Sequence, residues 1–194
     1  MWAMRLLLAL LLAATLYVAS LVLFPVEHIT VIGNRHLKTE EILTRTQLYA
    51  GEPWLWIRSD RLQGLLRDPW VAEARLEKPR IGEVRLILRE REPFLPLADG
   101  NALATDGTVL PGGAPMAKGP RVEGQGPLPV QDLLALARAY PKATRLRYTP
   151  AGFWVETPQG VVFAPEAQLL VKYAHLGMPK GRVYLYSWGV SVSP

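Results

Sequence analysis

The chain of 194 residues contains no cysteine and only three histidines. The lack of cysteine excludes disulfide bonds, thiolate zinc sites and a cysteine nucleophile. His28, His36 and His175 lie far apart in the sequence and show no ligand spacing to one another. We therefore expect no metal site and no cofactor.

Motifs of common catalytic centres are also missing. The sequence has no G-x-S-x-G, S-x-x-K, H-E-x-x-H or P-loop pattern. Asp99 and Asp106 come nearest to a carboxylate pair, but each precedes a glycine, and this dipeptide predicts a turn. No catalytic residue is assigned, and we expect a protein that is not an enzyme and has no small-molecule substrate.

A basic stripe of the kind that binds nucleic acid is absent. Lys and Arg number 22 against 17 Asp and Glu, so the net charge is +5. The basic residues are mixed with acids, as between Arg80 and Glu92, whereas a nucleic-acid footprint needs one sign of charge on one face. We expect solvated Arg/Glu faces and no nucleic-acid partner.

One long apolar run is present, at the N-terminus. Residues 6–24 carry no charge, and a helix of about 20 residues crosses a bilayer core of roughly 30 Å. We predict a cytoplasmic tail over residues 1–5, a transmembrane helix over 6–24 that contacts membrane lipid, and the bulk of the chain outside the cytoplasm. The alternative is a cleaved signal peptide with a site at Val18–Ser20, although its apolar run would measure about 7–15 residues.

A small α+β unit is predicted directly after the apolar run. Periodicity and turn signals predict, in order, a strand over 26–33, a helix capped by Thr39, a helix from Ser59 or Asp60 to Asp68, and strands at 72–77 and 84–89. Each of the last two strands has one apolar face, as in an antiparallel sheet covered on one side. Two helices can cover a three-stranded sheet, so residues 26–93 form one domain.

Three tryptophans and one leucine triplet refine this prediction. Leu62, Leu65 and Leu66 are expected on the buried face of the second helix. Trp70 is expected in the core. The segment of Trp54 and Trp56 joins the helices, with one face predicted in the core and the other near the bilayer interface.

Residues 94–194 predict a mainly antiparallel β-domain with flanking helices. Asp99-Gly100 and Asp106-Gly107 separate short apolar runs and indicate hairpins. Helices are predicted at 130–140 and from Pro165, and strands at 121–123, 146–148, 153–156, 161–163 and 182–192.

The last of these strands carries the candidate partner-binding residues: Arg182, Val183, Tyr184, Leu185, Tyr186 and Trp188. The strand is either buried within the domain or is its outer edge, where unpaired backbone groups add a partner's strand. Tyr, Trp and Arg are enriched at binding hot spots, which is why we name these residues. Which face of the strand is exposed stays open.

The element order resembles a known family once certain residues are added to it. Val31-Ile32-Gly33-Asn34, Pro69-Trp70-Val71, Ala74 and the run Arg89–Pro93 resemble a POTRA domain, specifically the single POTRA domain of the bacterial cell-division proteins FtsQ and DivIB. The resemblance covers the layout of the whole chain. In residues it is strong from Ile29 to Pro93 and vague from Gly112 onward.

This resemblance implies a non-enzymatic divisome scaffold, a single-pass protein of the cytoplasmic (inner) membrane at the division septum. Such a protein recruits FtsB and FtsL and links them to septal cell-wall synthesis, and FtsB adds a strand at the end of the β-domain. Two alternatives remain. One is an anchored POTRA module for protein export or outer-membrane assembly, and the other is a secreted enzyme with a cleaved signal peptide.

Overall fold

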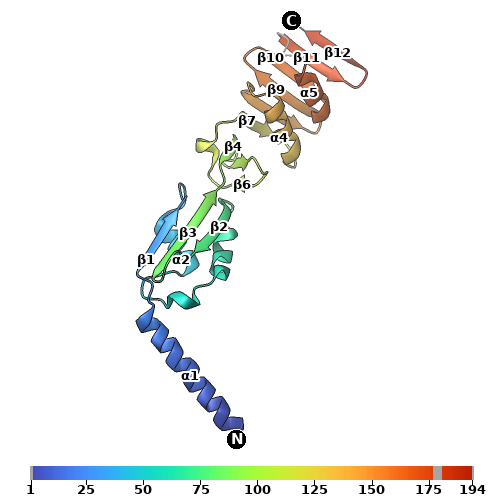
Figure 1. Ribbon diagram of the computed structural model, residues 1–194. Helices are drawn as coiled ribbons and strands as arrows, with labels where there is room; N and C mark the ends of the chain where they lie inside the picture. The colour runs from blue at the N-terminus through green and yellow to red at the C-terminus, as the bar shows by residue number, and fades with distance from the viewer. Residues whose placement is uncertain (1, 177–180, 194) are drawn as a thin grey trace. The chain divides into compact units, whose positions relative to one another are not determined.

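The computed structural model describes residues 2–176 and 181–193. The chain divides into two compact units, Met1–Arg91 and Glu92–Pro194. Figure 1 shows the elements of each unit from the N-terminus in blue to the C-terminus in red.

The first unit begins with helix α1, Trp2–Leu23. Within the described part of the chain, its segment Met4–Leu23 is the one helix long and apolar enough to cross a membrane. Its 20 residues measure about 30 Å at 1.5 Å per residue, which equals the thickness of a bilayer core. The predicted N-terminal apolar helix is confirmed.

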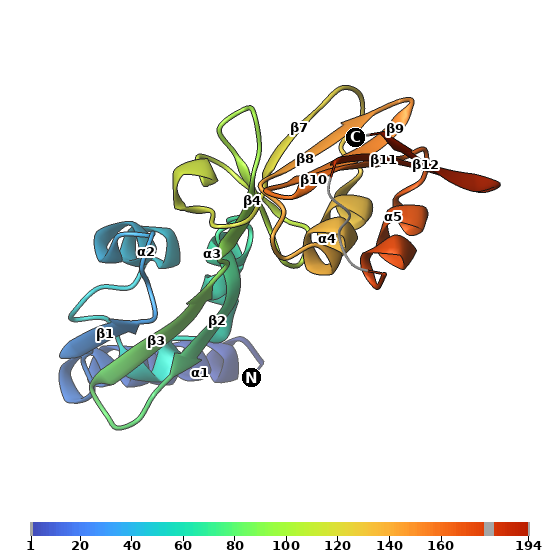
Figure 2. The ribbon, with the colours of Figure 1, turned by 90° about the horizontal axis from the view of Figure 1, so that it is seen from above.

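A three-stranded sheet follows α1. The elements are β1 His28–Ile32, α2 Thr39–Thr46, the 3₁₀ helices η1 Trp54–Trp56 and η2 Ser59–Leu62, α3 Gln63–Leu66, β2 Val71–Glu77 and β3 Glu83–Glu90. The strand order is β1-β3-β2, with β1 parallel and β2 antiparallel to β3 (Figure 2). The predicted element order is confirmed. The antiparallel pairing expected of the last two strands is confirmed for β2 and β3. Strand β1 pairs parallel to β3, because the helices form a crossover connection between β1 and the β2–β3 pair.

The core of this unit lies between the sheet and the helical segments. Eleven buried residues form it: Val26, Leu37, Ile42, Leu48, Ile57, Leu62, Leu65, Val71, Val84, Leu86 and Leu88. The alternation of β3 is confirmed, since Val84, Leu86 and Leu88 all point inward.

Two local predictions are wrong. Leu66 is exposed, because η2 and α3 replace the continuous helix. A 3₁₀ helix has about three residues per turn, against 3.6 in an α-helix, and this difference rotates the buried face. Thr39 is the first helical residue and not the cap of α2. Lys38 holds the cap position, and the Thr39 hydroxyl accepts a hydrogen bond from Asn34 at 3.3 Å.

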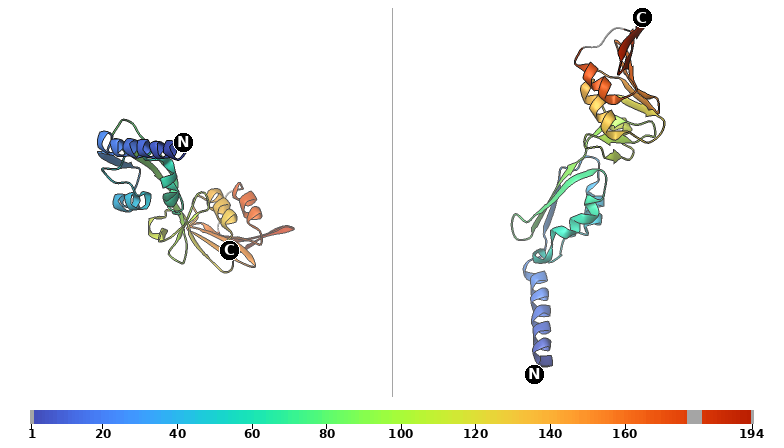
Figure 3. Two further views of the ribbon diagram at one scale, coloured as in Figure 1. Left: turned by 90° about the horizontal axis from the view of Figure 1, so that it is seen from below. Right: turned by 90° about the vertical axis from the view of Figure 1, so that its right-hand side faces the viewer.

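The second unit contains two sheets and two main helices. A small antiparallel sheet comprises β4 Pro93–Pro96, β5 Ala102–Ala104 and β6 Val109–Leu110, with η3 Ala114–Met116 after it. The larger sheet has the order β12-β11-β10-β9-β8-β7. Its strands are β7 Arg121–Gly124, β8 Arg145–Thr149, β9 Gly152–Thr157, β10 Gly160–Ala164, β11 Gly181–Tyr186 and β12 Gly189–Ser193. Helices α4 Val130–Ala139 and α5 Ala167–Ala174 pack on one face of it (Figure 3).

This unit is mainly antiparallel, as predicted. Of the five pairings in the large sheet, β7–β8 and β10–β11 are parallel and the other three are antiparallel. The hairpins predicted at Asp99-Gly100 and Asp106-Gly107 connect β4 to β5 and β5 to β6. The α+β fold class is therefore confirmed for both units.

Tyr140 ties the two helices of the second unit together. It follows α4 and donates its phenolic hydrogen to the Leu170 carbonyl of α5, at 2.6 Å. Burial raises the pKa of Tyr140 to about 12 from an ordinary value of 10.0, because the phenolate would lose its water. The neutral phenol therefore stabilises the fold fully below pH 10, and this contribution is lost as the pH rises towards 12.

We expect one of the seven tyrosines to titrate near pH 12 in a spectrophotometric titration, and Tyr140→Phe to abolish that step. At neutral pH the variant should lose about 1 kcal/mol of unfolding free energy, since one buried hydrogen bond is removed. Tyr49→Phe is the control, because Tyr49 is exposed and its removal leaves the late step in place. Persistence of that step in Tyr140→Phe would contradict the assignment.

Candidate partner-binding site

The C-terminal residues predicted as one strand form a hairpin. Strands β11 and β12 pair antiparallel, with Tyr186 opposite Gly189 and a turn at Ser187 and Trp188. The prediction of a single outer strand over 182–192 is therefore wrong. Strand β11 is second in the sheet order, and β12 is the outermost strand. A turn of two residues reverses the chain, which the alternation of side chains alone does not reveal.

The six candidate residues divide between two faces of the sheet. Val183 and Leu185 are buried in the core beneath the helices, so neither can contact a partner directly. Tyr184 and Tyr186 are half-buried on the opposite face. The remaining two are exposed: Arg182 on β11, and Trp188 in the turn with 84% of its surface accessible. The open face is therefore that of Arg182, Tyr184 and Tyr186.

Aromatic rings form a row across this open face. Trp154 on β9 lies opposite Phe163 on β10, with ring centroids 4.5 Å apart, and Phe163 lies opposite Tyr184 at 6.0 Å. Tyr186 and Trp188 stack at 5.1 Å with an interplanar angle of 10°. Trp154 and Phe163 were not predicted as part of the site, because only the strand registers bring Phe163 next to β11 and Trp154 next to Phe163.

Among the described residues, no strand pairs with the outer edge of β12. Opposed residues in an antiparallel pair alternate between bonded and non-bonded, and a two-residue turn closes on a bonded pair, here Tyr186 and Gly189. The N–H and C=O groups of Val190 and Val192 therefore point away from β11. Their side chains are 59% and 61% exposed. At the other edge of the sheet, Val122 of β7 forms a bridge with Leu97, so the two edges differ.

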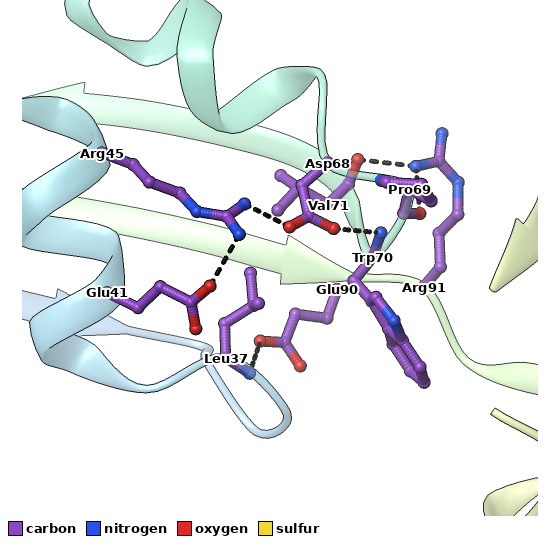
Figure 4. Close-up of polar contacts among 9 residues, drawn as sticks. All are labelled: Leu37, Glu41, Arg45, Asp68, Pro69, Trp70, Val71, Glu90 and Arg91. Atoms are coloured by element: carbon purple, nitrogen blue, oxygen red, sulfur yellow. Dashed lines mark hydrogen bonds and ion pairs between the residues drawn. The ribbon is translucent and has the colours of Figure 1, made fainter. Parts of the chain in front are cut away.

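Polar side chains of the first unit have a structural arrangement (Figure 4). Arg45 forms ion pairs with Glu41, at 2.6 Å, and with Asp68, whose other oxygen accepts the backbone N–H of Trp70 at 2.8 Å. The hydrogen bond to Asp68 raises the pKa of Arg45. These contacts fix the segment before β2, including Trp70.

Trp70 and Glu90, which belong to the POTRA-like sequence motifs, also make structural contacts. Trp70 is buried, as predicted, and stacks on His36 with ring centroids 3.7 Å apart. The Glu90 carboxylate accepts the backbone N–H groups of His36 and Leu37, at 2.7 and 3.0 Å. Glu90 thus joins the end of β3 to the loop before α2.

The carboxylates considered for chemistry act within their own turns. Asp99 accepts the backbone N–H of Asn101, and Asp106 accepts that of Thr108, each at 3.0 Å. Within residues 2–176 and 181–193, no three His, Asp or Glu side chains are placed to hold a metal ion.

The first unit has the architecture of a POTRA domain: a strand, helical segments and two further strands that form a sheet in the order β1-β3-β2. Within this unit these elements follow the apolar helix α1. The family model of the POTRA domain, FtsQ-type, matches residues 24–91, which end where the first unit ends. No curated protein matches the chain.

The chain thus carries an FtsQ-type POTRA domain. Together with the preceding helix, this domain fits a single-pass protein of the FtsQ/DivIB kind.

Proposed function

We propose that the protein is a non-enzymatic scaffold of the bacterial cell-division machinery. The FtsQ-type POTRA domain supports a division-related protein. In this proposal residues 1–5 lie in the cytoplasm, residues 6–24, all but the last of them in α1, span the cytoplasmic membrane, and the domains at 26–93 and 94–194 lie outside at the septum. A long following domain crosses the membrane largely regardless of charge, which favours this orientation.

The proposed partners are FtsB- and FtsL-like proteins, recruited by the hairpin β11–β12. The observation that carries this step is the outer edge of β12, with which no strand pairs in the described part of the chain. An extended partner segment would pair with the outward backbone groups of Val190 and Val192 and cover both side chains. Recruitment then positions the enzymes of septal cell-wall synthesis.

The candidate residues take distinct roles in this complex. Arg182, Tyr184, Tyr186 and Trp188 provide side-chain recognition on the open face and at the turn. Val183 and Leu185 contribute indirectly. Their burial holds β11 against the helices, and β11 in turn keeps β12 in place. The backbone of β12 supplies most of the affinity.

A proline substitution in β12 tests strand addition. Val190→Pro removes an outward N–H without removing a hydrogen bond to β11, and proline is tolerated on edge strands. We expect the affinity for the FtsB–FtsL pair to fall by about tenfold or more, which corresponds to roughly 1.4 kcal/mol. Calorimetry or interferometry on the full chain in nanodiscs measures the affinity, and circular dichroism checks the fold.

Two controls separate the backbone from the side chain. Val190→Ala keeps the N–H and should weaken binding by less than about threefold. Ser191→Pro removes an inward N–H, so it should disrupt the hairpin as well as binding. Native affinity of a folded Val190→Pro variant would exclude strand addition at β12.

A further inference from the structure

The 3₁₀ helix η1 is fastened to the C-terminal end of α1. The backbone N–H of Trp54 donates to the Phe24 carbonyl at 3.0 Å, and Pro25 and Pro53 form an isolated bridge. The indole N–H of Trp56 donates to the Ser20 hydroxyl at 3.0 Å. The backbone bridge at Pro25 and Pro53, of which the Trp54–Phe24 bond is part, and the side-chain bond to Ser20 therefore hold η1 beside the last turn of the apolar helix.

These contacts place Trp56 alongside the helix and not beyond it. Its ring lies 6.0 Å from the ring of Tyr17, which precedes the helix end at Leu23 by six residues, or about 9 Å. The apolar segment Met4–Leu23 needs its whole length to cross a bilayer core. With α1 across the bilayer as proposed, Trp56, beside Ser20 and Tyr17, lies just inside the outer boundary between acyl chains and headgroups.

The surface of η1 is apolar where it is open. Leu55 and Trp56 are 52% and 56% exposed. Several of its polar groups are bonded within the protein: Lys78 donates to the carbonyls of Trp54 and Leu55, at 2.8 and 3.3 Å, and Ile57 donates to Trp54. Polar groups without partners are costly at membrane depth, so this segment suits a lipid environment.

We infer that Leu55 and Trp56 form a lipid-facing wedge of the POTRA domain that enters the outer leaflet of the bilayer. The inference rests on the proposed membrane span of α1. The wedge contacts a lipid surface, because it is continuous with the span and tryptophan is enriched at this depth of the bilayer. Arg58, two residues after Trp56, is largely exposed in a 3.9 Å ion pair with Asp60 and is placed to reach lipid phosphates. The wedge fixes the rotation of the POTRA domain about α1.

The absence of cysteine allows a direct test by single spin labels. Labels are introduced at Leu55→Cys, at Leu11→Cys in the middle of α1 and at Ile32→Cys. Ile32 is 45% exposed at the far end of β1 and serves as the matched control. The full chain is reconstituted in vesicles of phosphatidylethanolamine and phosphatidylglycerol. Power saturation then compares accessibility to oxygen, which concentrates in acyl chains, with accessibility to a nickel chelate in water.

The expected result is an oxygen-to-nickel ratio several-fold higher at Leu55→Cys than at Ile32→Cys, with the highest value at Leu11→Cys. A Leu55 label as open to nickel as the Ile32 label, beside an embedded Leu11 label, overturns the wedge and leaves the span intact. A Leu11 label open to nickel overturns the span, and the wedge with it.

Native fluorescence provides a second test without a label. In vesicles of brominated lipid, Trp56→Phe should lower the fraction of tryptophan emission that is quenched, because a quenched ring is removed. Trp188→Phe is the control and should raise that fraction, since Trp188 lies in the second unit, outside the span. If the quenched fraction of the emission also rose in Trp56→Phe, Trp56 would lie in water and the inference would be overturned.

Discussion

A Gly33→Ala variant is expected to lose most of the stability of the POTRA domain. Gly33 has φ +90°, and a Cβ atom there would lie 2.0 Å from the Leu88 carbonyl oxygen. Leu88 belongs to the central strand β3, so relief of the overlap requires the loop after β1 to move away from the sheet. The left-handed backbone costs about 1–2 kcal/mol and the overlap adds to it, for a total above about 4 kcal/mol.

Gly51→Ala is the matched control for this prediction. Gly51 has the same φ of +90°, but nothing lies within 4 Å of its added Cβ. The Gly51→Ala variant should therefore lose only the backbone cost of about 1–2 kcal/mol from its unfolding free energy. Chemical denaturation of the full chain in nanodiscs, followed by tryptophan fluorescence, measures both variants. Equal losses would mean that the Leu88 contact is relieved at no cost.

The second large effect is expected at a buried ion pair. Glu52 is 4% exposed and its carboxylate accepts a hydrogen bond from Arg61 at 2.5 Å and one from the Tyr49 backbone at 3.0 Å. Arg61→Met removes the counter-charge and leaves a buried carboxylate. Breaking such a pair costs about 3–5 kcal/mol, and we expect about 2–3 kcal/mol because Arg61 is partly open to water.

A double variant isolates the buried charge as the cause. Glu52→Gln combined with Arg61→Met leaves a neutral amide that still accepts the Tyr49 N–H, so at least half of the lost stability should return. Arg89→Met breaks the exposed pair with Glu73 and should change the unfolding free energy little. A double variant less stable than Arg61→Met would show that packing, and not charge, determines the loss.

Half-buried elements could be predicted from the sequence because one face of each is apolar. The alternation of Val84, Leu86 and Leu88 identified β3, and the helical spacing of Leu133, Leu134 and Ala137 supported α4. Turn dipeptides located the hairpins of the small sheet. Local patterns of this kind need no knowledge of distant residues.

Pairing between distant strands could not be predicted in the same way. The parallel register of β1 on β3 depends on the crossover. The row formed by Trp154, Phe163 and Tyr184 depends on two registers at once, that of β9 on β10 and that of β10 on β11. The turn at Ser187 and Trp188 is indicated in the sequence only by Gly189, the residue that follows it. The candidate residues were therefore named, while the strand that forms the sheet edge was missed.

The parallel pairing of β1 with β3 also determines how the POTRA domain bears tension. The chain enters β1 shortly after α1, and it leaves β3 at Glu90, next to the second unit. A pull between the membrane and the second unit therefore draws neighbouring strands in opposite directions along their length. The five register pairs from His28–Glu83 to Ile32–Ile87 are loaded together in shear and do not open one after another. In the proposed role at the division septum, constriction would therefore pull on this domain with little extension of the chain.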